Sequence, residues 1–410
     1  MSEAGLRAVS ALGFVALLGL AALCSTDRRA IDRRTVFAGV ALQLAIALLL
    51  LATPIRDAIL PFFERLVSLL VEWSQAGARF LFGPLLDTGQ SFALGVLPLI
   101  IFMGTLFGVL YHAGLVQPIV RAFSHALSRS MRVSGAESLA AASNVFVGMI
   151  ESGIVVGPYL ARMTRSELFA FMTLGMSTIA GTVLVTYAQI LGAATYAGHL
   201  IVASLISAPA ALVVAKIMIP ETGTPETASG DALAHEERAA NVIDAAAAGA
   251  LAGLRLALAV GALLIAFVSL IALANSAVGA LGSLVGWPDL TLQSIFGLLF
   301  APVAALMGVP WAEAREVGAL IGVKTVLNEF IAYQDLANAI ADGRIGPRGA
   351  LIASYALCGF ANFGSLAILL GGLEALAPER RSEAARLGLR SILAGTIATC
   401  LTGCLAGLIA

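Results

Sequence analysis

The feature that most constrains this chain is a series of apolar stretches, each long enough to cross a lipid bilayer. They occupy residues 5–24, 35–55, 92–115, 167–191, 197–219, 254–278, 316–336, 348–370 and 387–409. A membrane-spanning helix needs about 20 apolar residues. The bilayer core holds no water, so the backbone of such a stretch must satisfy its own hydrogen bonds, as a helix does. The sequence therefore predicts an all-α integral membrane protein with about eight spanning helices.

The composition agrees with lipid as the main solvent and disfavours several other classes of protein. Of 410 residues, 59% are hydrophobic and 12% are charged, whereas soluble domains carry about 25% charged residues. The net charge of −1 gives no indication of a nucleic-acid partner. No C-x-x-C pair, phosphate-binding loop or nucleophile elbow occurs in the sequence. We therefore expect neither an enzyme nor a bound cofactor.

Several segments do not look like ordinary spans. Residues 56–82 carry charges among leucines and phenylalanines, which indicates a helix lying in the membrane interface. Residues 223–241 are polar and divide the chain into halves, and each half contains an apolar stretch interrupted by Gly and Pro, at 134–159 and 290–311. Such paired interruptions are typical of the binding segments of an inverted-repeat transporter, although two kinked helices would give the same pattern.

These boundaries predict six successive parts of the chain. They are N-terminal scaffold helices with an interfacial helix (1–130), a first transport repeat (131–219), a polar linker with an interfacial segment (220–253), a scaffold helix (254–289), a second transport repeat (290–370) and a C-terminal helix (371–410).

Three clusters place polar groups in otherwise apolar sequence: Glu151 at the first interruption, Glu329 five residues after Lys324, and the pair Asn362 and Ser365. A carboxylate at membrane depth costs several kcal/mol unless it is paired or hydrated, so both glutamates are functional candidates. Lys324 and Glu329 do not share a helix face, so Glu329 needs another partner, and a ribose diol would serve. Alternatively, Glu151 could end a span at the interface, and Asn362 and Ser365 could join helices.

The sequence around these clusters resembles the concentrative nucleoside transporter family, most clearly in GVPWAEAREVGALIGVKTVLNEFIAY and YALCGFANFGSLAILLGGLEALAPERR. The resemblance runs from about residue 76 to the C-terminus. It implies a homotrimer in the cell inner membrane that couples nucleoside uptake to sodium. Each protomer would have scaffold helices and a mobile transport domain with two partly unwound helices and two re-entrant hairpins, at 135–163 and 290–312.

The resemblance also implies which residues bind the solute and the ion. A glutamate of the first hairpin and two further residues would hold the base, and a glutamate, an asparagine and a serine would hold the ribose. The residues expected at the solute are Gly148, Met149, Ile150, Glu151, Val183, Glu329, Phe360, Asn362 and Ser365. Those expected to bind sodium are Asn144, Val147, Thr178 and Ile179.

At the tip of the first hairpin this chain reads Gly148-Met149-Ile150-Glu151 where the family has Gly, Gln, Thr or Ser, and Glu. Met and Ile cannot hydrogen-bond a base edge, and each unpaired polar atom costs roughly 1–3 kcal/mol. We therefore expect weaker binding of uridine and cytidine, and a preference for a purine or a modified nucleoside. Two alternatives stay open: proton coupling through Glu151 or Glu329, and a nucleoside sensor that does not transport.

Overall fold

The structure, a computed structural model, describes residues 2–88, 92–192, 194–228, 239–284, 286–287 and 290–409, and in these ranges the regular elements are helices. The first part comprises α1 (Glu3–Leu23), α2 (Arg33–Leu51), α3 (Ile55–Phe82), η1 (Gly83–Thr88), α4 (Phe92–His112), α5 (Gln117–Met131), α6 (Gly135–Phe146), α7 (Met149–Val155), α8 (Gly157–Leu160), α9 (Arg165–Ser177), α10 (Gly181–Ile190) and α11 (Ala194–Met218). The second part comprises α12 (Val242–Leu284), α13 (Leu292–Leu306), α14 (Ala314–Val326), α15 (Glu329–Ala341), α16 (Pro347–Leu357), α17 (Phe363–Leu376), η2 (Pro378–Arg380) and α18 (Arg381–Ile409).

Seven helical stretches among the described residues are long and apolar enough to cross a membrane. They comprise α1, α2, α4, α9 with α10, α11, α12, and η2 with α18. This confirms the predicted fold class of an all-α membrane protein. Residues 56–82, where an interfacial helix is predicted, lie within the amphipathic helix α3.

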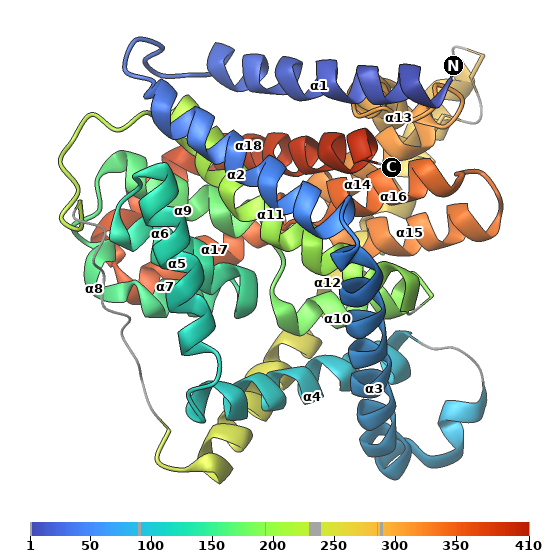
Figure 1. The fold of residues 1–410 in the computed structure, drawn as a ribbon. Coiled ribbons are helices and arrows are strands. Elements are labelled where there is room, and N and C mark those ends of the chain that lie inside the picture. Colours follow the sequence, from blue (N-terminus) through green and yellow to red (C-terminus); the bar gives the residue numbers. More distant parts are fainter. Residues whose placement is uncertain are drawn as a thin grey trace.

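The helices separate into a buried centre and an exposed periphery. In α11 and in α9 with α10, 89% of the most apolar window is buried, whereas in α12 only 17% is. α1 lies alongside α18, and α3, α4 and part of α12 extend away from the packed centre, in the lower half of the view (Figure 1). The apolar surface of α4 and α12 must therefore face lipid or another protein chain.

Helices α4 and α12 cross at a very short distance because each carries a Gly-x-x-x-Gly pair at the crossing. A Cβ atom on Gly104 would lie 2.7 Å from the carbonyl oxygen of Gly249, and one on Gly249 would lie 2.5 Å from that of Gly104. Gly108 and Gly253 extend the contact on either side. Small residues at this spacing let membrane helices approach backbone to backbone.

The same glycines explain why one predicted boundary is wrong. Residues 242–253 were assigned to a linker and interfacial segment that precedes a scaffold helix, yet α12 runs without a break from Val242 to Leu284. The glycines in this region serve the close contact with α4 and do not end the helix. Residues 229–238 of the predicted linker lie outside the described residues.

The second hairpin lies elsewhere in the chain than predicted. Residues 292–306 of the stretch 290–312 form the single helix α13, which continues through Pro302 and packs along α14. The interrupted pair is α14 and α15, separated by Leu327 and Asn328. A dense run of Gly and Pro misled the prediction, because a proline within a membrane helix does not have to end it. Here the interruption comes from Asn328, an extended residue whose side chain caps α15.

Four helix interruptions lie inside the packed centre. They are at 147–148 between α6 and α7, at 178–180 between α9 and α10, at 327–328 between α14 and α15, and at 358–362 between α16 and α17. The first falls within the hairpin predicted at 135–163, and its turn requires glycine, because Gly148 has a φ of 118°. Each interruption leaves backbone N–H and C=O groups that need partners.

Replacing Gly249 with Ala should force α4 and α12 apart, because the added methyl group would meet a backbone oxygen. We expect a loss of about 1–3 kcal/mol of stability, measured as earlier thermal unfolding of the solubilised protein. The matched control is Gly77→Ala in α3, where a Cβ atom meets nothing within 4 Å. Equal unfolding temperatures for both variants would contradict the close crossing.

Candidate functional site

Two half-helices begin at asparagines that cap them. The Oδ1 atom of Asn328 accepts the N–H of Ile331 at the start of α15, and that of Asn362 accepts the N–H of Ser365 at the start of α17. Asparagine is among the best residues for this role because its short side chain reaches the free N–H groups of the first turn. Both caps fix the first residues of α15 and α17, where the predicted ribose-binding groups lie.

Glu329 is the centre of this region. Its Oε1 atom accepts the hydroxyl of Tyr187 at 2.8 Å, and its Oε2 atom accepts the amide Nδ2 of Asn362 at 2.8 Å. The sequence predicted correctly that Glu329 is not paired with Lys324, whose Nζ atom donates to a carbonyl and a hydroxyl instead. The prediction omitted the two protein donors, of which Tyr187 was not on the list of candidates.

The two donors leave the carboxylate half free. A carboxylate offers about four lone-pair positions, two on each oxygen. Tyr187 occupies one on Oε1 and Asn362 one on Oε2, and the backbone N–H of Glu329 also interacts with the carboxylate, so at most two positions remain. This arrangement suits a ligand with two neighbouring hydroxyl groups, each donating to a different oxygen. The start of α15 adds its helix dipole, which stabilises the charge of Glu329.

The Tyr187 hydroxyl is directed at Glu329 by an aromatic cluster. The ring of Tyr187 stacks on Tyr333, with centroids 4.7 Å apart, and meets Phe330 edge to face at the same distance. Tyr333 and Phe330 belong to α15, as Glu329 does. A sequence signal was present, since Tyr187 is a polar aromatic four residues after Val183, on the same face of α10.

Three other predicted solute residues lie near these groups in the chain and are buried: Phe360 and Ser365 of the second repeat, and Val183 of the first. Phe360 lies in the interruption before α17, and its carbonyl accepts the N–H of Asn362. Ser365 is in the first turn of α17, and Val183 is buried in the first turn of α10. The structure thus brings Asn362, Ser365 and Glu329 together through hydrogen bonds and places Val183 one turn from Tyr187.

The tip residues of the first hairpin point in different directions. Glu151, in the first turn of α7, is exposed, and its Oε2 atom lies 3.0 Å from the position that a Cβ atom on Gly148 would take. Met149 is 8% exposed and packs against Gly175. Ile150 is 41% exposed. Both line an apolar pocket against α17.

The four predicted sodium residues lie where helices α6 and α9 end. The amide Nδ2 of Asn144 donates to the Thr178 hydroxyl and to the Leu174 carbonyl, each at 2.7 Å. Val147 and Thr178 are the residues at the C-terminal ends of α6 and α9, and the Ile179 carbonyl accepts a hydroxyl from α11. Helix C-termini carry partial negative charge, so this place suits a small cation bound by neutral oxygens.

The base of the first hairpin is held by a buried ionic network. Lys216 at the end of α11 lies 2.6 Å from Glu137 and 3.2 Å from Glu221. Glu137 also closes a capping box at the start of α6, and Glu167 closes another at the start of α9. The Ser134 hydroxyl joins the two boxes by donating to Glu167 at 2.6 Å. Satisfied networks of this kind fix the relative positions of their helices.

The end of the first hairpin, at and after α8, is hydrogen-bonded to the turn between α17 and α18. Arg380, in the turn between α17 and α18, donates to the carbonyls of Leu160, Ala161 and Met163 at the end of α8. A cation is favourable at a helix C-terminus. Because α17 contains Ser365 and begins after Asn362, these hydrogen bonds connect the end of the first hairpin to that helix.

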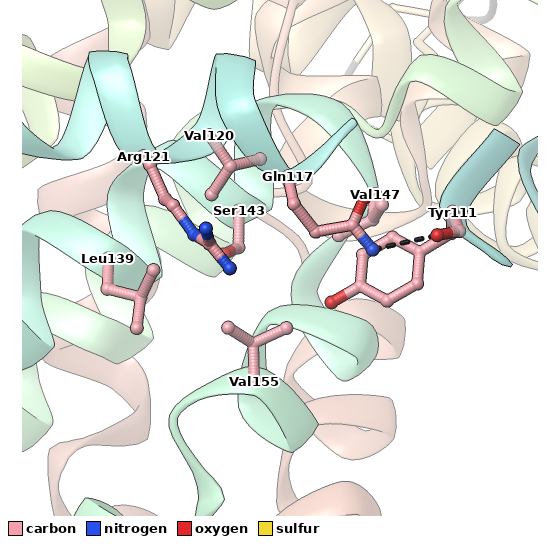
Figure 2. Close-up of a pocket in the computed structure, with 8 residues that line it drawn as sticks. All are labelled: Tyr111, Gln117, Val120, Arg121, Leu139, Ser143, Val147 and Val155. Carbon is pink, nitrogen blue, oxygen red and sulfur yellow. Dashed lines mark hydrogen bonds between the residues drawn. The ribbon is translucent and has the colours of Figure 1, made fainter. Parts of the chain in front are cut away.

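A pocket lies between α5 and the helices of the first hairpin, α6 and α7 (Figure 2). It is lined by Tyr111, Gln117, Val120, Arg121, Leu139, Ser143, Val147 and Val155. Gln117 closes one end by donating to the Tyr111 carbonyl at 2.7 Å (Figure 2). None of the groups around Glu329 takes part in its lining. The solute residues therefore do not lie in this pocket.

Comparison with known families matches three successive parts of the chain. Residues 12–85 match "Na+ dependent nucleoside transporter N-terminus", residues 93–194 match "Nucleoside recognition", and residues 199–407 match "Na+ dependent nucleoside transporter C-terminus".

Individual proteins are similar over the whole length. The uncharacterized transporter YutK of Bacillus subtilis (strain 168) is 48% identical over 400 residues, covering 97% of this chain and 98% of YutK. The nucleoside permease NupC of Helicobacter pylori is 37% identical over 410 residues, covering 97% of each protein. The structure of CNTnw in an inward-facing substrate-bound state is 41% identical, with a TM-score of 0.92 over 98% of each chain.

Tyr187→Phe should weaken binding of a ligand that carries a vicinal diol, because the carboxylate of Glu329 loses the donor that orients Oε1. Hydrogen bonds to charged groups contribute about 1.5–3 kcal/mol, so the affinity for a ribonucleoside should fall at least about tenfold. Affinity for the matching 2′,3′-dideoxynucleoside should change much less. Tyr333→Phe is the matched control, because its hydroxyl donates to the Ser354 carbonyl. A loss of the same size in both variants would leave Tyr187 with a packing role only.

Proposed function

Because the chain belongs to the concentrative nucleoside transporter family, we propose that it takes up nucleosides together with sodium by alternating access. Membership makes it a multi-pass protein of the inner membrane that transports nucleosides and is not an enzyme. Sodium coupling, the roles of individual residues and the base preference are the parts that we propose.

The single observation that carries the proposal is the half-satisfied carboxylate of Glu329. It is buried, and beyond the bonds from Tyr187, Asn362 and its own backbone N–H it keeps at most two free lone-pair positions. A ribose supplies two neighbouring hydroxyls that match these positions. Asn362 and Ser365 are near enough to Glu329 in the hydrogen-bond network to contact the same sugar. The base would then extend toward Val183, Phe360 and Glu151.

Sodium would be bound by Asn144, Val147, Thr178 and Ile179. The Gly148 turn lies next to Ala180, in the interruption between α9 and α10. An ion that joins the ends of α6 and α9 would therefore fix both sides of this turn and position Glu151 for the solute. Each ligand would raise the affinity of the other, typically by 1–3 kcal/mol. The inward sodium gradient could then drive uptake.

The periphery supports the homotrimer that the family implies. Helices α4 and α12 are locked together by their glycine pairs and expose most of their apolar surface. We propose that this rigid pair contributes to contacts between protomers, while the centre that contains the four interruptions moves. Cross-linking of exposed positions on α12 would detect such contacts.

Thr178→Val tests the coupling ion. The change keeps the shape of the side chain but removes a hydroxyl that accepts from Asn144 and donates to Leu174. In proteoliposomes, the sodium concentration for half-maximal nucleoside uptake should rise about tenfold, the effect of about 1.4 kcal/mol. Thr186→Val is the control, because that hydroxyl is buried without a hydrogen-bond partner and its loss should leave the sodium dependence unchanged.

The same assay separates the alternatives. Wild-type uptake that follows a pH gradient and ignores sodium would make the protein a proton-coupled carrier and overturn the ion assignment. Nucleoside binding without any uptake, under either gradient, would indicate a sensor. A normal sodium response in Thr178→Val would remove this hydroxyl from the ion site.

The base preference is proposed to rest on Ile150 more than on Met149. Met149 is buried by packing, whereas Ile150 is partly exposed at the tip. Ile150→Thr should therefore raise uridine affinity several-fold by adding a hydrogen-bonding group, worth about 0.5–1.5 kcal/mol. Met149→Gln is the comparison, because it buries an amide against Gly175 and should reduce stability without improving uridine binding. Equal uridine affinity in wild type and in the double variant would show that neither residue sets the base preference.

A further inference from the structure

The interrupted helices occur twice with a constant spacing. From the end of α6 at Phe146 to the end of α14 at Val326 is 180 residues, and the same distance separates the end of α9 at Ser177 from the end of α16 at Leu357. The helices that follow the first interruptions, α7 and α15, also start 180 residues apart, at Met149 and Glu329. Each position at the ends of α6 and α9 therefore has a counterpart in the second repeat.

The counterpart of Asn144 is Lys324. Both residues lie in the last turn of the helix before an interruption, in α6 and α14, and they too are 180 residues apart. Asn144 connects α6 to α9 by donating to the Leu174 carbonyl and the Thr178 hydroxyl. Lys324 is oriented in a comparable way toward the end of α16, the counterpart of α9.

Lys324 is enclosed by groups that normally surround a cation. Its side chain is fully buried, and Nζ lies 2.8 Å from the Ala356 carbonyl and 2.9 Å from the Thr399 hydroxyl oxygen. The Thr399 hydroxyl itself donates to the Thr396 carbonyl, so its oxygen faces Lys324 as an acceptor. Among the described residues Nζ of Lys324 has a carbonyl and a hydroxyl as its direct partners, and the carboxylate of Glu329 acts on its charge only from a longer distance.

Two helix ends add to the negative potential around Lys324. Ala356 belongs to the last turn of α16, and Lys324 lies in the last turn of α14. The C-terminal ends of both helices carry partial negative charge, as do those of α6 and α9 around the sodium residues. A buried ammonium is costly unless such groups satisfy it. The second repeat therefore offers a cation environment that a side chain of the protein already fills.

We propose that Lys324 is a built-in cation, which takes in the second repeat the role that sodium takes in the first. The ammonium joins α14, α16 and α18 permanently and so holds Glu329 and Asn362, which follow the two interruptions, in position without an ion. The transporter then needs one sodium ion per nucleoside, since the second cation is part of the chain. This inference rests on the sodium site proposed above.

The experiment replaces the Lys324 ammonium with a side chain whose oxygen could bind a sodium ion from solution. Lys324→Asn introduces the side chain found at Asn144, and Lys324→Met introduces an apolar side chain of comparable length. The probes are sodium chloride and choline chloride at equal ionic strength. The readouts are the thermal stability of the solubilised protein and the sodium-to-nucleoside ratio of uptake in proteoliposomes.

We expect Lys324→Asn to unfold earlier than wild type in choline and to recover in sodium, with a ratio that rises from about one to about two ions per nucleoside by mass action. Lys324→Met should unfold early in both salts and lose most of its uptake. Tyr333→Phe is the control, because it removes another buried donor to a carbonyl of α16, that of Ser354, and leaves no carboxylate unpaired. It should lose stability without gaining a response to sodium.

Two results would overturn the inference. One is that sodium stabilises Lys324→Asn no more than it stabilises wild type, which can be measured even if the variant does not transport. The other is that Lys324→Met keeps the wild-type stability and uptake. Failure of the underlying sodium site looks different, because wild type itself would then show no sodium dependence and Thr178→Val would change nothing.

Discussion

The structure depends on how four helix interruptions inside an apolar protein satisfy their backbone groups. An interrupted helix has N–H groups at one end and carbonyls at the other that make no hydrogen bond within the helix, and lipid cannot supply hydrogen-bond partners for them. Here all four interruptions lie in the packed centre and contact one another. Gly148 lies against Ala180, and Asn362 donates to Glu329. The energetic need to pair these groups therefore gathers the polar residues of both repeats in one place.

The two ends of an interruption serve opposite charges. The N-termini of the half-helices, with their free N–H groups, carry Glu151 and Glu329, each in the first turn. The C-termini of the helices before the interruptions, with their free carbonyls, carry Asn144 and Lys324, each in the last turn. The helix dipole favours this distribution. It separates the place proposed for the hydroxyl groups of a solute from the places proposed for cations, and short turns connect the two.

The scaffold and the centre are stabilised by different means. In the crossing of α4 and α12, glycines allow the backbones to touch, which gives a rigid contact without polar groups. In the centre, buried networks such as Lys216 with Glu137, and Arg380 with the carbonyls after α8, fix helix ends that belong to distant parts of the sequence. A rigid periphery around a centre tied by many directional bonds is consistent with movement of the centre as one unit.

The sequence alone determined the membrane class, the all-α fold and the family, because apolar segment length and contiguous motifs are local properties of the chain. It also singled out Glu329, Asn362 and Ser365 as candidates, since polar residues are conspicuous in apolar helices, and the structure joins these three by hydrogen bonds. It misplaced the second interruption, because Gly and Pro content does not report which helix end a cap such as Asn328 satisfies. Only the tertiary structure decided that Tyr187 donates to Glu329, that Lys324 bonds Ala356 and Thr399, and that Met149 is buried while Ile150 is exposed. Tyr187 and Glu329 are 142 residues apart, and a pairing at that distance depends on how helices pack, which no local pattern of residues specifies.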